Sequence, residues 1–144
     1  GIRKLIIVNG HGGNSFKNMI RDLSVDFPDF LIAITNWYGI VPQEGYFENK
    51  DDHAGELETS VMMYYHPELV NLEEAGEGTS KPFALSSLNA QIAWLPRYWS
   101  KVSADTGIGD PRKSTPEKGE RYAKAVIEKL ALLFTEIGSK EVYL

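Results

Sequence analysis

The chain has 144 residues, of which 42% are hydrophobic and 24% charged, and this composition fits one globular domain with its own core. Its net charge of −5 argues against a nucleic-acid partner, because phosphate binding needs clustered Lys and Arg. No apolar run approaches the about 18 residues of a membrane span, and no signal-peptide pattern is present, so we expect a cytoplasmic protein without a membrane partner. The chain has no cysteine, so any metal ion must be held by His, Asp or Glu.

The first third of the chain has the pattern of an α/β protein. Residues 5–8 are continuously apolar, which predicts a strand buried on both faces, as in a parallel sheet. Apolar positions then recur at helical spacing, with Asn14 or Ser15 available as the N-cap. A second apolar strand is predicted over residues 30–34. Residues 4–36 therefore form a strand–helix–strand unit with an expected right-handed crossover.

The remainder alternates between connecting segments and helices. Residues 37–51 are predicted to form a loop that leads to a helix over residues 53–65 with Asp52 as its N-cap. Residues 73–113 are rich in Gly and Pro, and we expect loops and short strands there. A last helix begins at Thr115-Pro116-Glu117 and ends at Gly138.

The first motif that carries chemistry is Asn-Gly-His-Gly-Gly-Asn-Ser over residues 9–15. It follows a strand of the predicted parallel sheet, where open α/β sheets usually bind their ligands, and it places His11 there. The glycines allow a tight turn and close approach of a ligand. The spacing of phosphate-binding loops is absent, which makes phosphate binding the weaker alternative. A tight turn with a solvated histidine is an equally good interpretation of this motif alone.

The second motif is Asp-His-Ala-Gly-Glu-Leu-Glu-Thr-Ser over residues 52–60. His53 and Glu56 are three residues apart and share one face of the predicted helix, whereas Glu58 points elsewhere. The helix dipole at the first turn favours an anionic Glu56 and a neutral imidazole, as a metal ligand or base requires. Alternatively, the acidic residues simply satisfy a solvated helix N-terminus.

Together, these motifs resemble the creatininase family of metal-dependent amidohydrolases. The resemblance also includes Asn36-Trp37 and Gly-Ile-Gly-Asp-Pro over residues 107–111, before Thr-Pro-Glu-Lys-Gly at 115–119. It implies a three-layer α/β/α fold with a mainly parallel sheet, a homohexamer, and two divalent metal ions, zinc before manganese or iron. The implied reaction is hydrolysis of the C–N bond, other than a peptide bond, of a linear or cyclic amide.

The resemblance also assigns roles to single residues. His11 matches a metal ligand, Trp37 matches a substrate-binding wall of the pocket, and His53 matches the catalytic histidine that contacts substrate and shuttles a proton. Creatininase itself has Tyr-Glu in place of Gly12-Gly13, and that glutamate is a metal ligand. We therefore hypothesise that Glu56 replaces it as a metal ligand, with Glu58 as the alternative, and that the substrate is not creatinine.

Family members also carry an upstream segment with Glu-x-His and a bridging aspartate, which this chain lacks. We therefore expect residues 1–144 to be one α/β domain that forms the C-terminal portion of a longer creatininase-like domain, inactive until the upstream segment completes it. The alternative is a non-catalytic remnant or assembly subunit of the same fold. In that case the aromatic residues Trp94, Tyr98 and Trp99 would serve subunit contacts, although core packing explains them equally well.

Overall fold

The computed structural model describes residues 1–49 and 52–143, which divide into two compact units. The first unit consists of Gly1–Pro42 and Lys124–Leu144, and the second of Gln43–Ala123. The expected single domain stays a prediction.

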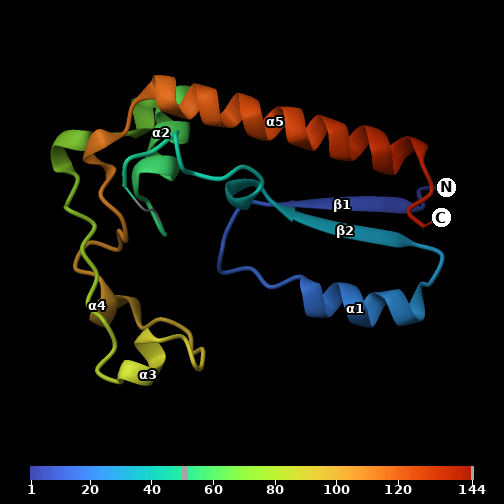
Figure 1. The fold of residues 1–144 in the computed structure, drawn as a ribbon, viewed down its shortest axis with the longest axis horizontal. Coiled ribbons are helices and arrows are strands. Elements are labelled where there is room, and N and C mark those ends of the chain that lie inside the picture. Colours follow the sequence, from blue (N-terminus) through green and yellow to red (C-terminus); the bar gives the residue numbers. More distant parts are fainter. Residues whose placement is uncertain (50–51, 144) are drawn as a thin grey trace. The chain divides into compact units, whose positions relative to one another are not determined.

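The first unit is built on a parallel pair of strands. Strand β1 (Lys4–Asn9) and strand β2 (Leu31–Asn36) pair along their whole length, and helix α1 (Lys17–Asp26) connects them. In Figure 1, α1 lies on one side of this pair and the C-terminal part of helix α5 (Pro116–Ser139) lies on the other. The predicted strand–helix–strand unit is therefore confirmed, with an α/β arrangement.

The start of α1 differs from its prediction. Phe16 occupies the N-cap position, its side chain makes no capping hydrogen bond, and its backbone is already helical. Asn14, one of the two predicted caps, instead donates its side-chain amide to Oδ1 of Asn9 at 2.9 Å. The asparagine thus stabilises the turn before the helix rather than the helix end.

The strands are less buried than predicted. Leu5 and Val8 of β1 are 44% and 45% exposed, although their continuous apolar run is typical of a strand covered on both faces. The cause is the size of the sheet, because β1 and β2 are the whole of it in the part of the chain that the structure describes. The apolar side chains of β1 are therefore only partly covered by the described residues.

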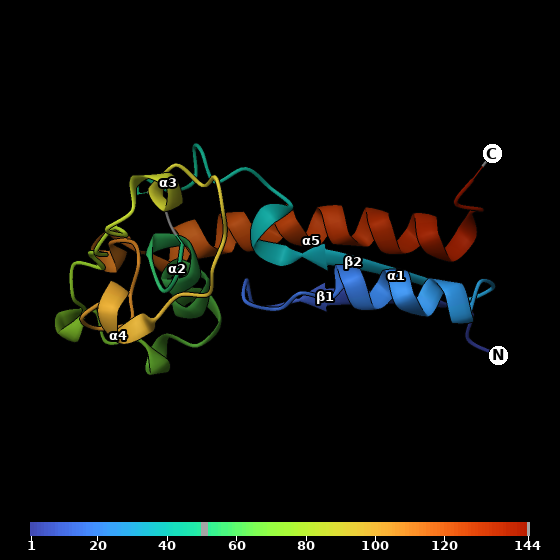
Figure 2. The same cartoon turned by 90° about the horizontal axis from the view of Figure 1, so that it is seen from below.

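The second unit contains short helices joined by irregular chain, as Figure 2 shows. Its helices are α2 (Glu56–Tyr65), α3 (Ser86–Asn89), α4 (Trp99–Val102) and the first residues of α5. The short strands predicted over residues 73–113 are wrong, because the described chain there forms helical turns and isolated bridges only. The 3₁₀ helices of the two units are Trp37–Gly39, Pro67–Leu69, Leu72–Glu74 and Pro111–Lys113.

Helices α2 and α5 form the core of the second unit. Leu57 of α2 and Tyr122 of α5 are almost completely buried. The rings of Tyr46 and Phe47 pack against the Tyr122 ring, with centroids at 5.4 and 5.2 Å. Burial raises the pKa of Tyr122 to about 12.

The two helices approach each other closely at Gly119. A Cβ atom at this position would lie 2.0 Å from the carbonyl oxygen of Ser60, so only glycine fits. The predicted helix start is confirmed nearby, since Thr115 Oγ1 accepts a hydrogen bond from the backbone N–H of Lys118 at 3.2 Å. None of the described helices combines the length and apolar character needed to span a membrane.

Candidate active site

Three asparagines hold the turn that carries His11. Asn9, at the end of β1, is buried, and its side-chain amide donates to the His11 carbonyl at 2.9 Å and to Oδ1 of Asn36 at 2.8 Å. Its Oδ1 accepts from the backbone N–H of His11 and from Asn14 Nδ2. Asn9 and Asn36 are register partners at the carboxyl ends of both strands. This network fixes the backbone of an exposed His11 on the edge where α/β sheets bind ligands.

The pairing of Asn9 with Asn36 was not predicted, although the sequence carries one signal of it. An asparagine follows each predicted apolar run within two residues, and both observed strands end on it, so their parallel pairing in register brings Asn9 and Asn36 side by side. Buried amides need partners, and two amides at one sheet end supply them for each other.

Gly13 and Trp37 border the same turn. A Cβ atom on Gly13 would lie 2.8 Å from Nε2 of His11, so a side chain there would displace the imidazole. Trp37 follows β2 directly, and its indole N–H donates to the carbonyl of Gly10 at 3.4 Å. The structure thus brings Trp37 to the turn that carries His11.

His53 does not belong to a helix, contrary to its prediction. Its backbone N–H donates to the carbonyl of Ile108 at 2.9 Å, and its carbonyl accepts from Ile108 N–H at 2.8 Å, which makes an isolated antiparallel bridge. Ala54 then has a positive φ of 51°, a conformation that no helix contains. Gly55 becomes the N-cap instead of Asp52, so α2 begins at Glu56. The predicted helical face shared by His53 and Glu56 is therefore wrong.

The carboxylate beside His53 belongs to Glu58. Oε2 of Glu58 lies 3.9 Å from Nδ1 of His53, and both side chains are 32% exposed. The same oxygen accepts from the backbone N–H of Ala54 at 2.7 Å, which supports the left-handed residue between them. The expectation that Glu58 points elsewhere is wrong, because helical spacing does not apply to a histidine that precedes the helix. A carboxylate here can pair with the imidazolium when the ring is protonated.

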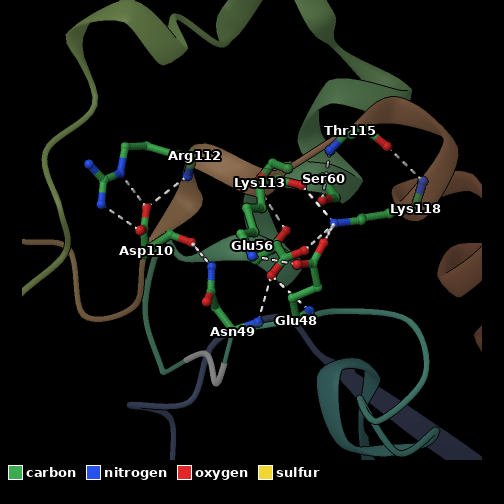
Figure 3. Close-up of polar contacts among 10 residues, drawn as sticks. Glu48, Asn49, Glu56, Ser60, Asp110, Arg112, Lys113, Thr115 and Lys118 are labelled. Carbon is green, nitrogen blue, oxygen red and sulfur yellow. Dashed lines mark hydrogen bonds and ion pairs between the residues drawn. The ribbon is translucent and has the colours of Figure 1, made fainter.

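Glu56 is fully buried, and both of its carboxylate oxygens are engaged (Figure 3). Oε2 accepts from the backbone N–H groups of Glu48 at 3.0 Å and Asn49 at 2.7 Å, while Oε1 accepts from the Lys118 ammonium. The hydrogen bond to Glu56 raises the pKa of Lys118. Lys118 also donates to the Lys113 carbonyl at 2.8 Å. A metal ion could reach this carboxylate only by displacing these donors.

Residues 107–111 support the site from a distance in sequence. Ile108 pairs with His53, as described above, and the Asp110 side chain accepts from the backbone N–H of Arg112 at 2.9 Å (Figure 3). The guanidinium of Arg112 bonds the same carboxylate and lowers the pKa of Asp110 to about 2. The Asp110 carbonyl accepts from Asn49 Nδ2 at 3.3 Å.

A cavity of about 440 Å³ lies beside α2 in the second unit, within the size range of small-molecule pockets. Glu58, Thr59 and Met62 line one wall, and residues 69–72 contribute to another. Glu58 thus borders both the cavity and the imidazole of His53, although His53 itself is not among the lining residues.

The predicted site residues are distributed over both units. His11 and Trp37 belong to the first, and His53 and Glu56 belong to the second. Among the described residues, no group of three or more His, Asp or Glu side chains is placed to hold a metal ion. These residues do not make a complete metal site by themselves, since catalytic zinc takes three protein ligands.

Comparison with known proteins identifies the family. The model of the family Creatininase, described as creatinine amidohydrolase, matches residues 1–134. The chain belongs to the creatininase family. The resemblance of its motifs is thereby confirmed, and so is the creatininase-like fold.

Relatives within the creatininase family carry two kinds of name. A mycofactocin precursor peptide peptidase of Mycobacterium ulcerans is 30% identical over 129 residues, covering 87% of this chain and 45% of the relative. A creatinine amidohydrolase of Pseudomonas putida is 22% identical over 147 residues, covering 91% and 54%. The chain thus spans about half the length of the curated relatives it matches.

Solved creatininase-family structures share the fold. The crystal structure of a Bacteroides fragilis protein provisionally named creatinine amidohydrolase superposes with a TM-score of 0.96 at 61% identity, covering all of this chain and 57% of that one. A crystal structure of creatininase superposes with a TM-score of 0.70 at 22% identity, covering 93% and 56%. Other creatininase structures are described as a Zn-Zn type and an Mn form.

Proposed function

We propose that the protein containing this chain is a metal-dependent amidohydrolase that cleaves the C–N bond of an amide, with His53 as its proton shuttle. The observation that carries the proposal is the half-exposed pair of His53 and Glu58, 3.9 Å apart, in a member of the creatininase family. A histidine beside a carboxylate is a common arrangement of a residue that accepts and returns a proton.

The chain's own residues account for the proton transfers. Hydrolysis breaks the C–N bond, forms a C–O bond to water, and moves a proton from the water to the leaving nitrogen. His53 takes that proton and delivers it to the nitrogen, while Glu58 balances the charge of the imidazolium. The bridge to Ile108 holds the backbone of His53 during both transfers.

We assign His11 as the ligand that this chain contributes to a divalent metal centre. A bound metal ion would polarise the amide carbonyl and generate a nucleophile from water. The exposed imidazole suits a ligand because the asparagines already fix the backbone of its turn, so the backbone need not be ordered when a metal ion binds. Trp37 borders this turn and is proposed to contact the substrate. The earlier assignment of Glu56 as a further ligand stays a prediction, although its contacts favour another role.

We further propose that the remaining ligands come from an upstream segment that this chain lacks. Two features support this. The half-exposed Leu5 and Val8 belong to an apolar strand that suits a wider sheet, and the 61% identical relative is longer than the chain. We also propose that the completed enzyme is a cytoplasmic homo-oligomer, a hexamer by family resemblance.

Hydrolysis of a peptide bond is a second candidate, because the peptidase relative of Mycobacterium ulcerans is 30% identical and the creatinine amidohydrolase is 22% identical. Both activities use the same proton transfers and differ in the space that the substrate site must provide around the scissile amide. A substrate panel of simple amides, creatinine and short peptides separates them.

The experiment compares the chain alone with the chain joined to the upstream part of the Bacteroides fragilis relative. Metal content by mass spectrometry and turnover of the panel are measured for both, with His53→Gln as the inactive control. We expect metal and activity in the joined protein only. Two bound metal ions in the chain alone would refute the split site. A joined protein that binds metal and cleaves no amide would instead support the non-catalytic remnant.

A further inference from the structure

An aromatic side chain distant in sequence packs beside His53. The ring of Trp99, the first residue of α4, lies with its centroid 5.0 Å from that of the His53 ring, and the two planes are tilted by 53°. This separation is within the range of interacting aromatic pairs. Trp99 is 37% exposed, so the indole covers one side of the imidazole and still presents surface to solvent.

Arg97 ties this indole to the residue before His53. Its guanidinium donates two hydrogen bonds to the carboxylate of Asp52, one of them at 2.9 Å, and lies 5.6 Å from the centre of the Trp99 ring. Bidentate pairing fixes the plane of the guanidinium, and the cation is attracted to the ring face. Arg97 thus contacts both Asp52, which precedes His53, and Trp99, whose ring packs beside His53.

The other aromatic residues of this segment behave differently. Trp94 and Tyr98 are 85% and 70% exposed, and the Tyr98 ring faces Lys101 instead. Trp99 is therefore distinguished by its place next to His53 and not by its hydrophobic character. The expected aromatic cluster at residues 94–99 consists of one ring at the site and two at the surface.

We propose that Trp99 is a specificity-determining wall of the substrate site at His53, and that Arg97 and Asp52 are its positioning residues. The inference rests on the proposed function in taking His53 to protonate the leaving nitrogen. An amide that presents its nitrogen to His53 must place the group on that nitrogen beside the indole. The wall therefore selects small or flat leaving amines and disfavours bulky ones.

The test compares the joined protein with its Trp99→Ala variant on acetamide and on an amide with a bulky amine, N-cyclohexylacetamide. The loss of the wall should raise kcat/KM for the bulky amide relative to acetamide by about 10-fold or more, the usual effect of changing one pocket contact. Trp94→Ala is the matched control and should leave the ratio unchanged. Trp99→Phe and Arg97→Lys should shift it in the same direction by less. An unchanged ratio in an active, folded Trp99→Ala variant would overturn the inference.

A second measurement does not depend on turnover. The chain has three histidines and three tryptophans, so each imidazole and indole signal is assigned by single substitution in a nuclear magnetic resonance spectrum. Trp99→Ala should move the His53 signal and leave those of His11 and His66 in place. Adding acetanilide should move the Trp99 indole signal before that of Trp94, even if the proposed activity fails. If neither the His53 signal responds to Trp99→Ala nor the Trp99 signal to acetanilide, the inference is overturned, independently of catalysis.

Discussion

Replacing Glu56 with glutamine separates two roles for this residue, a structural one and the predicted metal ligand. Glutamine has one acceptor oxygen and one amide NH₂. If its oxygen faces the backbone N–H groups of Glu48 and Asn49, its NH₂ group faces the Lys118 ammonium. If it is turned round, two buried N–H groups face a donor. Either orientation leaves donors opposed to donors at a fully buried position.

The magnitude follows from these contacts. Removing one partner of a buried ion pair costs about 3–5 kcal/mol. The side chain of Lys118 retains 19% exposure and keeps its bonds to Glu48 and the Lys113 carbonyl, which places the expected loss at the lower end, about 3 kcal/mol. For a chain of this size that is a decrease in Tm of roughly 6–12 °C.

The assay is thermal unfolding of metal-free protein, so that loss of a bound ion cannot contribute to the change. Glu73→Gln is the control, because Glu73 is an exposed carboxylate and its replacement should change stability by less than about 0.5 kcal/mol. The double variant with methionine at both Glu56 and Lys118 should lose less than the sum of the two single changes, since no unpaired charge remains. A Glu56→Gln protein with unchanged Tm and reduced metal content would refute the structural role and support the ligand.

Three further predictions concern stability and titration. Gly119→Ala should destabilise the fold by about 3 kcal/mol or more, because its Cβ would collide with the backbone of α2. Gly138→Ala, in open space on the same helix, should be neutral or stabilising. Chemical denaturation of both variants measures the difference. The pKa of Asp110 is lowered to about 2, so its contribution to folding stability is complete above its ordinary pKa of about 3.9 and is lost as the pH falls towards 2. Asp110→Asn should therefore reduce the loss of stability between about pH 4 and pH 2. An unchanged loss of stability over that range would contradict the role of Arg112. One of the seven tyrosines should ionise only near pH 12 in a spectrophotometric titration of the folded protein, and Tyr122→Phe should remove that step. Because the folded state holds the Tyr122 proton more tightly than the unfolded state, folding stability should fall as the pH rises from about 10 towards 12.

Local patterns in the sequence were sufficient for β1, β2, α1 and α5 and for the family. The apolar run before His11, the helical spacing after it and the start at Pro116 all correspond to structure, since strands and helices depend on neighbours within a few residues. The two motifs were also sufficient to indicate the creatininase family, which the comparison over residues 1–134 confirms. These conclusions needed no knowledge of distant contacts.

The tertiary structure decided the surroundings of each candidate residue. His53 leaves the helix because it pairs with Ile108, 55 positions away, and this pairing brings Glu58 rather than Glu56 to its ring. Glu56 is engaged by Lys118, 62 positions away. Such partners depend on which segments pack together in the folded chain, and helical periodicity does not predict them. The sequence alone determined the fold class and the family, whereas long-range hydrogen bonds determined which side chain stands beside the histidine.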